Sequence, residues 1–163
     1  MSGTIETSKL RTQPLQGADR KQHPLKWLRL VLAVRAWALW IPVLARGKEL
    51  QPLLTRAGPG RGTPYRGLSV DSIARCCRVA VCRPILMADR PCLREGLLLN
   101  RFLVMAGYAP TLHLGVDRTS LNSPRMKAHC WIELGDRIFN PPDANMVEIH
   151  VHHSGREMAA EAR

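Results

Sequence analysis

A leucine-rich helical segment with a cysteine at its start most constrains how this chain can fold. Residues 93–106 read Leu-Arg-Glu-Gly-Leu-Leu-Leu-Asn-Arg-Phe-Leu-Val-Met-Ala, a run of helix formers rich in core residues. Pro91 suits the first turn of a helix, and Gly107 followed by Pro110 marks its end. The segment therefore predicts a central helix that other elements must cover.

Cys92 would lie in the first turn of that helix. Unpaired backbone N–H groups and the helix dipole favour negative charge there. A thiol in such a place can act as a nucleophile, because the thiolate is the reactive form. Most cysteines, however, are small buried hydrophobic residues. The helix alone leaves both interpretations open.

Composition limits the class of protein. The 163 residues suffice for one domain with an extension, and 45% of them are hydrophobic. A net charge of +11 favours an acidic partner, nucleic acid or anionic lipid. Nucleic acid is not expected, because the basic residues are scattered, aromatic residues are few and no recognition motif is present. The odd count of five cysteines and a polar N-terminus predict reduced thiols in the cytoplasm. No cofactor signature is evident, and a need for nucleotide is left open.

Changes in composition predict five segments. They are a flexible tail at 1–22, an N-terminal helical segment at 23–57, a Gly/Pro linker at 58–67, a catalytic core at 68–153 and a frayed C-terminus at 154–163. The tryptophan-rich residues 24–46 are too short and too interrupted by arginine to span a bilayer. They are expected to pack on the core, with peripheral membrane contact or a partner's groove as alternatives. A kink is expected near Pro42 and a second short helix at 47–57.

Secondary structure in the core follows from local patterns. Ser69 or Asp71 can cap a helix that reaches Val81, and Cys76, Cys77 and Cys82 are expected in core packing rather than at a metal. Alternation of apolar residues predicts strands at 111–116, 128–134, 137–140 and 147–153. His150 and His152 on the last strand are interpreted as polar surface, so no metal site is predicted.

A two-residue hairpin brings possible partners to Cys92. Gly135-Asp136 is expected to be the turn, which pairs Leu134 with Arg137, Ile132 with Phe139 and Trp131 with Asn140. Period-two alternation puts His129, Trp131 and Glu133 on one face. Asn140, opposite Trp131, then has its amide within reach of the imidazole of His129. Cysteine, histidine and asparagine in this order form a predicted catalytic triad.

The chain also resembles a known family. Pro91-Cys92-Leu93-Arg94, the helix ending in Ala106-Gly107-Tyr108, the strand Leu112–Val116 and Ala128-His129-Cys130-Trp131-Ile132-Glu133 are similar to leader peptidases of lasso-peptide biosynthesis, which are transglutaminase-like cysteine peptidases. The resemblance covers roughly residues 25–145. It implies an α+β fold with a transglutaminase-like or papain-like core, in which a central helix packs on a small antiparallel sheet behind an N-terminal helical segment.

The resemblance also implies a function and partners. The family removes the leader from a ribosomally made precursor peptide, which a separate small leader-binding protein presents, and an asparagine-synthetase-like cyclase then closes the ring. It implies Cys92 as nucleophile and His129 as base. The family has an aspartate near the end of the strand after the hairpin, where this chain has Asn140, with Asp143 as the fallback. Alternatives are an acyltransferase on the same scaffold and a non-catalytic scaffold or membrane-docking protein.

Overall fold

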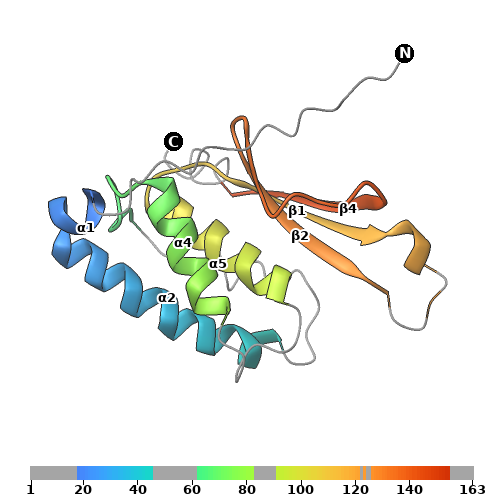
Figure 1. The fold of residues 1–163 in the computed structure, drawn as a ribbon, viewed down its shortest axis with the longest axis horizontal. Helices are drawn as coiled ribbons and strands as arrows, with labels where there is room; N and C mark the ends of the chain where they lie inside the picture. The colour runs from blue at the N-terminus through green and yellow to red at the C-terminus, as the bar shows by residue number, and fades with distance from the viewer. Residues whose placement is uncertain (1–17, 46–61, 83–90, 122, 124–125, 155–163) are drawn as a thin grey trace, which may run out of the picture.

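The computed structural model describes residues 18–45, 62–82, 91–121, 123 and 126–154. The helices are α1 (Ala18–Gln22), α2 (Pro24–Ala45), α4 (Val70–Val81) and α5 (Pro91–Met105), with a 3-10 turn at Arg118–Ser120. The strands are β1 (Thr111–Asp117), β2 (Ala128–Leu134), β3 (Arg137–Phe139) and β4 (Met146–His153). The strands form one antiparallel sheet beside the helices, as Figure 1 shows. The predicted α+β fold with a central helix on a small antiparallel sheet is confirmed.

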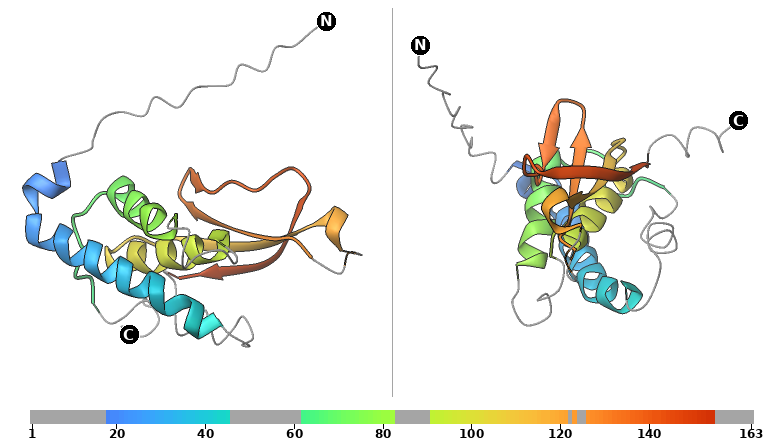
Figure 2. Two further views of the ribbon diagram at one scale, coloured as in Figure 1. Left: turned by 60° about the horizontal axis from the view of Figure 1, so that its bottom comes forward. Right: turned by 90° about the vertical axis from the view of Figure 1, so that its right-hand side faces the viewer.

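Helix α5 lies at the centre of the molecule. It contacts α2 and α4 on one side and strands β1 and β2 on the other, and Figure 2 shows it between these layers. Every residue from Gly96 to Val104 is buried, which explains why the segment carries apolar residues around its whole circumference. Gly107 ends the helix with φ of 90°, and the N–H groups of Gly107 and Tyr108 donate to Val104 and Leu103. The predicted start at Pro91 and stop at Gly107 are confirmed.

Helix α2 packs one apolar stripe into the core and runs past its proline. Leu30, Val34, Ala38 and Ile41 are buried against the rest of the protein. The helix continues through Pro42 to Ala45 rather than breaking there. A proline inside a helix removes one backbone hydrogen bond, and α2 continues past Pro42 by less than one further turn. Among the described residues, no helix is long and apolar enough to cross a membrane. The expected helix at 47–57 lies outside the described residues.

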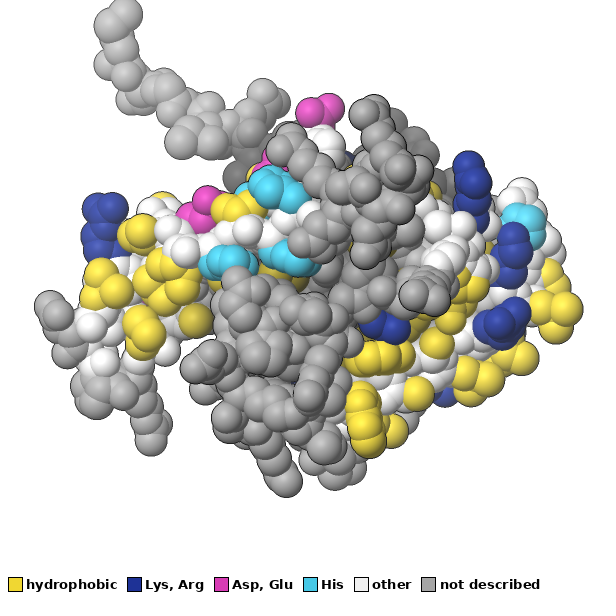
Figure 3. Space-filling model, turned by 180° about the vertical axis from the view of Figure 1, so that it is seen from behind, with side chains coloured by type: hydrophobic (Ala, Val, Ile, Leu, Met, Phe, Trp, Pro, Cys, Tyr) yellow, Lys and Arg dark blue, Asp and Glu magenta, His cyan; other side chains and the backbone are white. Residues whose placement is uncertain are grey.

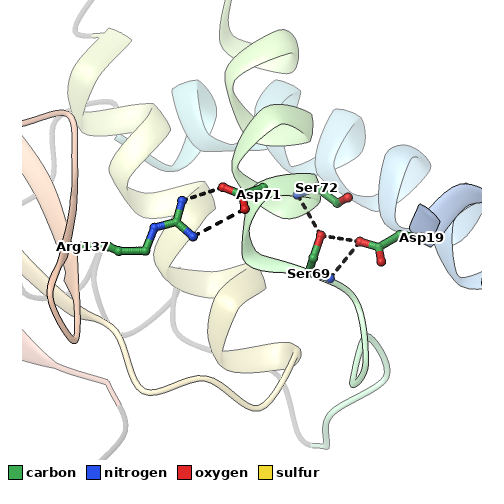
Figure 4. Close-up of polar contacts among 5 residues, drawn as sticks. All are labelled: Asp19, Ser69, Asp71, Ser72 and Arg137. Atoms are coloured by element: carbon green, nitrogen blue, oxygen red, sulfur yellow. Dashed lines mark hydrogen bonds and ion pairs between the residues drawn. The ribbon is translucent and has the colours of Figure 1, made fainter. Parts of the chain in front are cut away.

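The start of α4 is fixed by side chains from two other elements (Figure 4). Ser69 is the N-cap and accepts a hydrogen bond from the Ser72 N–H at 3.3 Å, as predicted. Asp19 of α1 accepts hydrogen bonds from both the N–H and the hydroxyl of Ser69. Arg137 of β3 pairs with Asp71 in the first turn. Residues 18–22 are therefore a helix joined to the core, which corrects the expected tail up to residue 22.

The sheet has the strand order β3-β2-β1-β4, and its two faces differ in chemistry. Leu112, Leu114 and Val116 of β1 are buried on the face that also carries Cys130 and Ile132 of β2. The same register puts His113 and Gly115 with Trp131 and His129 on the opposite face. One face thus builds the core, and the other displays the polar residues of the candidate site.

The hairpin between β2 and β3 follows the predicted register for three pairs and then departs from it. Ile132 pairs with Phe139 and Leu134 with Arg137 across Gly135, whose φ is 56°. The expected pair of Trp131 with Asn140 does not form, because the ladder ends at Phe139. Asn140 has φ of 54° and leads into two prolines, which takes the chain out of the strand.

The end of the described chain is held tightly. Ser154 is buried, its hydroxyl donates to the Asn100 side chain at 2.8 Å, and its N–H donates to the Pro110 carbonyl. The expectation of fraying from residue 154 is therefore corrected for Ser154. The remainder of that segment, 155–163, lies outside the described residues, as do residues 1–17 of the tail and 58–61 of the linker.

Candidate active site

Cys92 is the second residue of α5 and points its thiol toward the start of β2. The sulfur lies 3.7 Å from the carbonyl oxygen of Ala128, the residue directly before His129. The side chain is partly exposed. The predicted nucleophile at the helix start therefore lies against the backbone of the residue that precedes the predicted base in β2.

A glycine on α5 allows this close approach. Gly96 lies one turn after Cys92, on the same side of the helix. A Cβ atom at Gly96 would overlap the sulfur of Cys130, whereas its distance to Leu112 would be an ordinary contact. Only a residue without a side chain lets the helix rest on β2 this closely. Sequence reasoning missed this role, although an isolated glycine inside a helix was a signal for close packing.

His129 is oriented by a backbone oxygen. Its Nε2 lies 2.9 Å from the carbonyl oxygen of Asn140. A carbonyl oxygen only accepts hydrogen bonds, so Nε2 must carry the proton in this contact. In the neutral ring Nδ1 then keeps its lone pair and is the atom able to take a proton. A histidine with a free Nδ1 lone pair can act as a general base.

The side chain of Asn140 is used elsewhere. Its amide oxygen accepts a hydrogen bond from Arg78 of α4 at 3.4 Å, and Arg78 also pairs with Glu95 of α5 at 3.3 Å. The predicted hairpin register puts the Asn140 amide within reach of His129. In the structure the main-chain carbonyl of Asn140 makes the contact with His129 instead. The left-handed backbone of Asn140 explains the difference, because it turns the carbonyl toward the ring and the amide toward α4.

Asp143, the fallback third residue, is exposed in the turn before β4. Its carbonyl accepts the N–H of Met146 at 3.0 Å. Within the described residues its carboxylate makes no hydrogen bond or ion pair. Of the two residues considered for this position, only Asn140 contacts His129.

Trp131 separates His129 from a second histidine on the same face. Its ring centroid lies 6.2 Å from that of His129 and 5.3 Å from that of His113, with interplanar angles of 18° and 5°. Gly115 makes room for the indole, because a Cβ there would come within 2.9 Å of the Trp131 ring. The three rings form a stack along the open face of the sheet.

His113 is buried and lies between two carboxylates. Its Nδ1 is 2.6 Å from Glu148, and its Nε2 is 3.1 Å from Glu133 at an angle that makes no hydrogen bond. No role for His113 was predicted from the sequence. The alternation of residues in β1 indicates that His113 lies on this face. The contact with Glu148 depends on the pairing of β4 with β1, which the sequence does not show.

Burial distinguishes the cysteines. Burial raises the pKa of the Cys76, Cys77 and Cys130 thiols, and proximity to Cys92 and Glu95 raises that of Cys130 further. Cys82 is exposed at the end of α4, which corrects its expected core packing. The predicted core packing of Cys77 is confirmed, and Cys92 is the partly exposed cysteine whose sulfur lies against Ala128, the residue before His129.

The histidines of β4 do not assemble a metal site with other described residues. His150 and His152 lie on the face of β1 that carries Leu114 and Leu112. Nε2 of His150 is buried without a hydrogen-bond partner. No group of three potential metal ligands is found within the described part of the chain.

Comparison with known protein families agrees with this geometry. The family described as the transglutaminase-like superfamily matches residues 29–152. The chain belongs to the transglutaminase-like superfamily. The match includes α4, α5, all four strands and most of α2, so the superfamily part of the resemblance is confirmed and covers the site. Neither the comparison with curated proteins nor that with solved structures gives a match.

The superfamily has a fold of the cysteine-peptidase and acyltransferase type. In a site of that type a thiol attacks an acyl carbon and a histidine carries the proton. In this chain a thiol lies at the start of α5 and an imidazole lies near the start of β2. The chain following β3 supplies the oxygen that fixes the tautomer.

Proposed function

We propose that the protein is a cysteine peptidase that removes the leader from a ribosomally made lasso-peptide precursor. The observation that carries the chemistry is the pair of contacts around His129. The Cys92 thiol lies against the carbonyl before it, and the Asn140 carbonyl binds its Nε2. This leaves Nδ1 as the proton acceptor beside a nucleophile at a helix start.

The proposed reaction has two stages. His129 takes the Cys92 proton as the sulfur attacks the scissile carbonyl carbon, and the backbone N–H groups at the start of α5 stabilise the resulting oxyanion. The C–N bond then breaks, and the imidazolium gives its proton to the leaving amine, which is the new N-terminus of the core peptide. Water next attacks the thioester with His129 as base, which releases the leader as a carboxylic acid and restores the thiol.

The substrate class rests on the sequence motifs around Cys92 and His129. Their resemblance to lasso-peptide leader peptidases supports a precursor peptide as substrate, a small separate leader-binding protein as its presenter and an asparagine-synthetase-like cyclase as the next enzyme. The net charge of +11 supports acidic groups on at least one of these partners.

The test is cleavage of a candidate precursor by purified protein together with the leader-binding protein, followed by mass spectrometry. Wild type is expected to release a leader with a free carboxylate. Cys92→Ala and His129→Ala are expected to lose at least 100-fold in rate. Cys82→Ala is the matched control, since it removes an exposed thiol away from His129 and should keep the wild-type rate.

Three results would contradict the proposal. Cleavage retained in Cys92→Ala would exclude the thiol as nucleophile. A leader released as an amide of an added amine, with no free acid formed, would assign acyl transfer instead of hydrolysis. Folded wild-type protein that leaves every lasso precursor uncut, while Cys92 still reacts with general acyl donors, would reject the substrate class but retain the chemistry.

A further inference from the structure

Helix α2 has a second apolar stripe that faces away from the core. Leu25, Leu28, Leu32 and Leu39 are 76%, 54%, 57% and 53% exposed. Leu28, Leu32 and Leu39 follow Leu25 by 3, 7 and 14 residues. These spacings put all four leucines on one side of the helix. Trp40 at the same end as Leu39 is 57% exposed. A helix that is apolar on both sides is normally covered on both sides.

Charge on the N-terminal helices is almost entirely positive. Helix α2 contains Lys26, Arg29 and Arg35 and no acidic residue. Arg29 and Arg35 are exposed, make no hydrogen bond or ion pair with a described residue, and lie on opposite flanks of the leucine stripe by helical periodicity. Helix α1 adds exposed Arg20 and Lys21, whereas its acid is bound to the N-cap of α4.

The picture of the molecule agrees with this distribution. Seen from behind, hydrophobic side chains gather along the edge formed by α2, with Lys and Arg side chains beside them (Figure 3). From Leu25 to Leu39 the stripe is about 21 Å long at the rise of an α-helix. It lies on the outside of α2, opposite the buried stripe of Leu30, Val34 and Ala38.

We propose that this outer face of α2 docks on an anionic lipid bilayer, with the helix parallel to the surface. The leucines would enter the boundary between headgroups and acyl chains. Arg29 and Arg35 would reach lipid phosphates on either side, and Trp40 would lie at headgroup depth. A bilayer offers apolar depth and negative charge along the whole stripe at once.

The same charges oppose a second copy of the chain as occupant. Two stripes packed face to face would bring Arg29 and Arg35 of each copy near the same residues of the other, without an acid on α2 to pair them. A protein groove would need acidic residues along both of its rims. Lipid binding is also independent of the proposed peptidase activity, because it is read without any substrate.

The experiment is flotation of the full-length protein with vesicles at low and high salt. One set of vesicles contains phosphatidylcholine with an equimolar amount of phosphatidylglycerol, and the other contains phosphatidylcholine alone. Wild type is expected to float with the anionic vesicles and to bind neutral ones at least 10-fold more weakly. Arg29→Gln with Arg35→Gln should reduce anionic binding roughly 30-fold, at about five-fold for each cation. Leu28→Gln with Leu32→Gln should reduce it roughly 100-fold.

Ile149→Gln is the matched control, because Ile149 is 59% exposed on β4 and lies outside α2. It should bind as wild type does, and circular dichroism should show the same fold for all variants. Failure of folded wild type to float with anionic vesicles would overturn the proposal, as would unchanged binding by the Leu28→Gln, Leu32→Gln variant. A wild-type dimer in solution that the same variant dissociates would assign the stripe to a second copy and would equally overturn it.

Discussion

Replacing Asn140 by residues of different backbone preference separates two roles for this position. If its carbonyl orients His129, the left-handed backbone at φ of 54° matters and the amide does not. Glycine adopts that backbone without strain, whereas a β-branched residue is strained there by about 1–2 kcal/mol. If the amide were the third member of the triad, both substitutions would remove it and would be equally harmful.

The expected magnitudes follow from the contacts. Asn140→Gly removes the hydrogen bond from Arg78, whose side chain is 63% exposed. The hydrogen bond therefore contributes about 1 kcal/mol at most, and its loss should slow the reaction of Cys92 by roughly five-fold at most. Asn140→Val adds the backbone strain and moves the carbonyl away from Nε2. Since a misplaced base no longer takes the thiol proton efficiently, we expect the reaction rate of Cys92 to fall roughly 100-fold.

The assay does not depend on knowing the substrate. The rate of alkylation of Cys92 by iodoacetamide, followed by mass spectrometry, reports the thiolate that His129 supports. Asn140→Gly should stay near the wild-type rate, and Asn140→Val should fall to the rate of His129→Ala. If the glycine and valine variants are equally slow while Asn140→Asp keeps the wild-type rate, the role assigned to the carbonyl is refuted.

Three further predictions concern the thiol, the helix packing and acid stability. In wild type Cys92 should be alkylated faster than Cys82 although Cys82 is more exposed, and equal rates by mass spectrometry would count against activation by His129. Gly96→Ala should lower the free energy of unfolding by about 2 kcal/mol because its methyl group overlaps the Cys130 sulfur. The same substitution should cost clearly less in a Cys130→Ala background, and an equal cost in both backgrounds in urea titrations would disprove the overlap. Burial alone would raise the pKa of Asp19, but hydrogen bonds from serines at the start of α4 lower it overall, so its contribution is present above about pH 4 and is lost as pH falls. Asp19→Asn should therefore destabilise by about 1 kcal/mol at neutral pH and by less once the pH falls through the lowered pKa of Asp19, and an effect that does not change with acidification would contradict this.

Local signals explain what could be predicted from the sequence. The ends of α5 were predicted correctly because Pro91 and Gly107 start and stop a helix through local backbone effects, which involve only residues a few positions away. The register of β2 on β3 was correct for three pairs because a two-residue turn fixes it. The pairing of Cys92 with His129 was predicted from the order of helix and hairpin together with the resemblance, and it remains a prediction, although the Cys92 sulfur lies against the residue before His129.

Contacts between distant residues explain what could not be predicted. The backbone of Asn140 turns out of the ladder where the hydrogen bond from Arg78 holds its amide, and these positions lie 62 residues apart. The pairing of His113 with Glu148 depends on β4 joining β1 across a bulge. The helix at residues 18–22 is too short to be recognised by periodicity. Its contact with the core is the hydrogen bond from Ser69 to Asp19, between residues far apart in the sequence.

The hydrogen bond between Ser154 and Asn100 has a consequence for how the protein is made. Asn100 is buried in the middle of α5, so its amide oxygen needs a partner, and that partner follows the last strand. On the ribosome the interior therefore stays incomplete until β4 and the serine after it have emerged. Products that stop before residue 154 should be degraded rather than accumulate, and fusion partners belong beyond that residue.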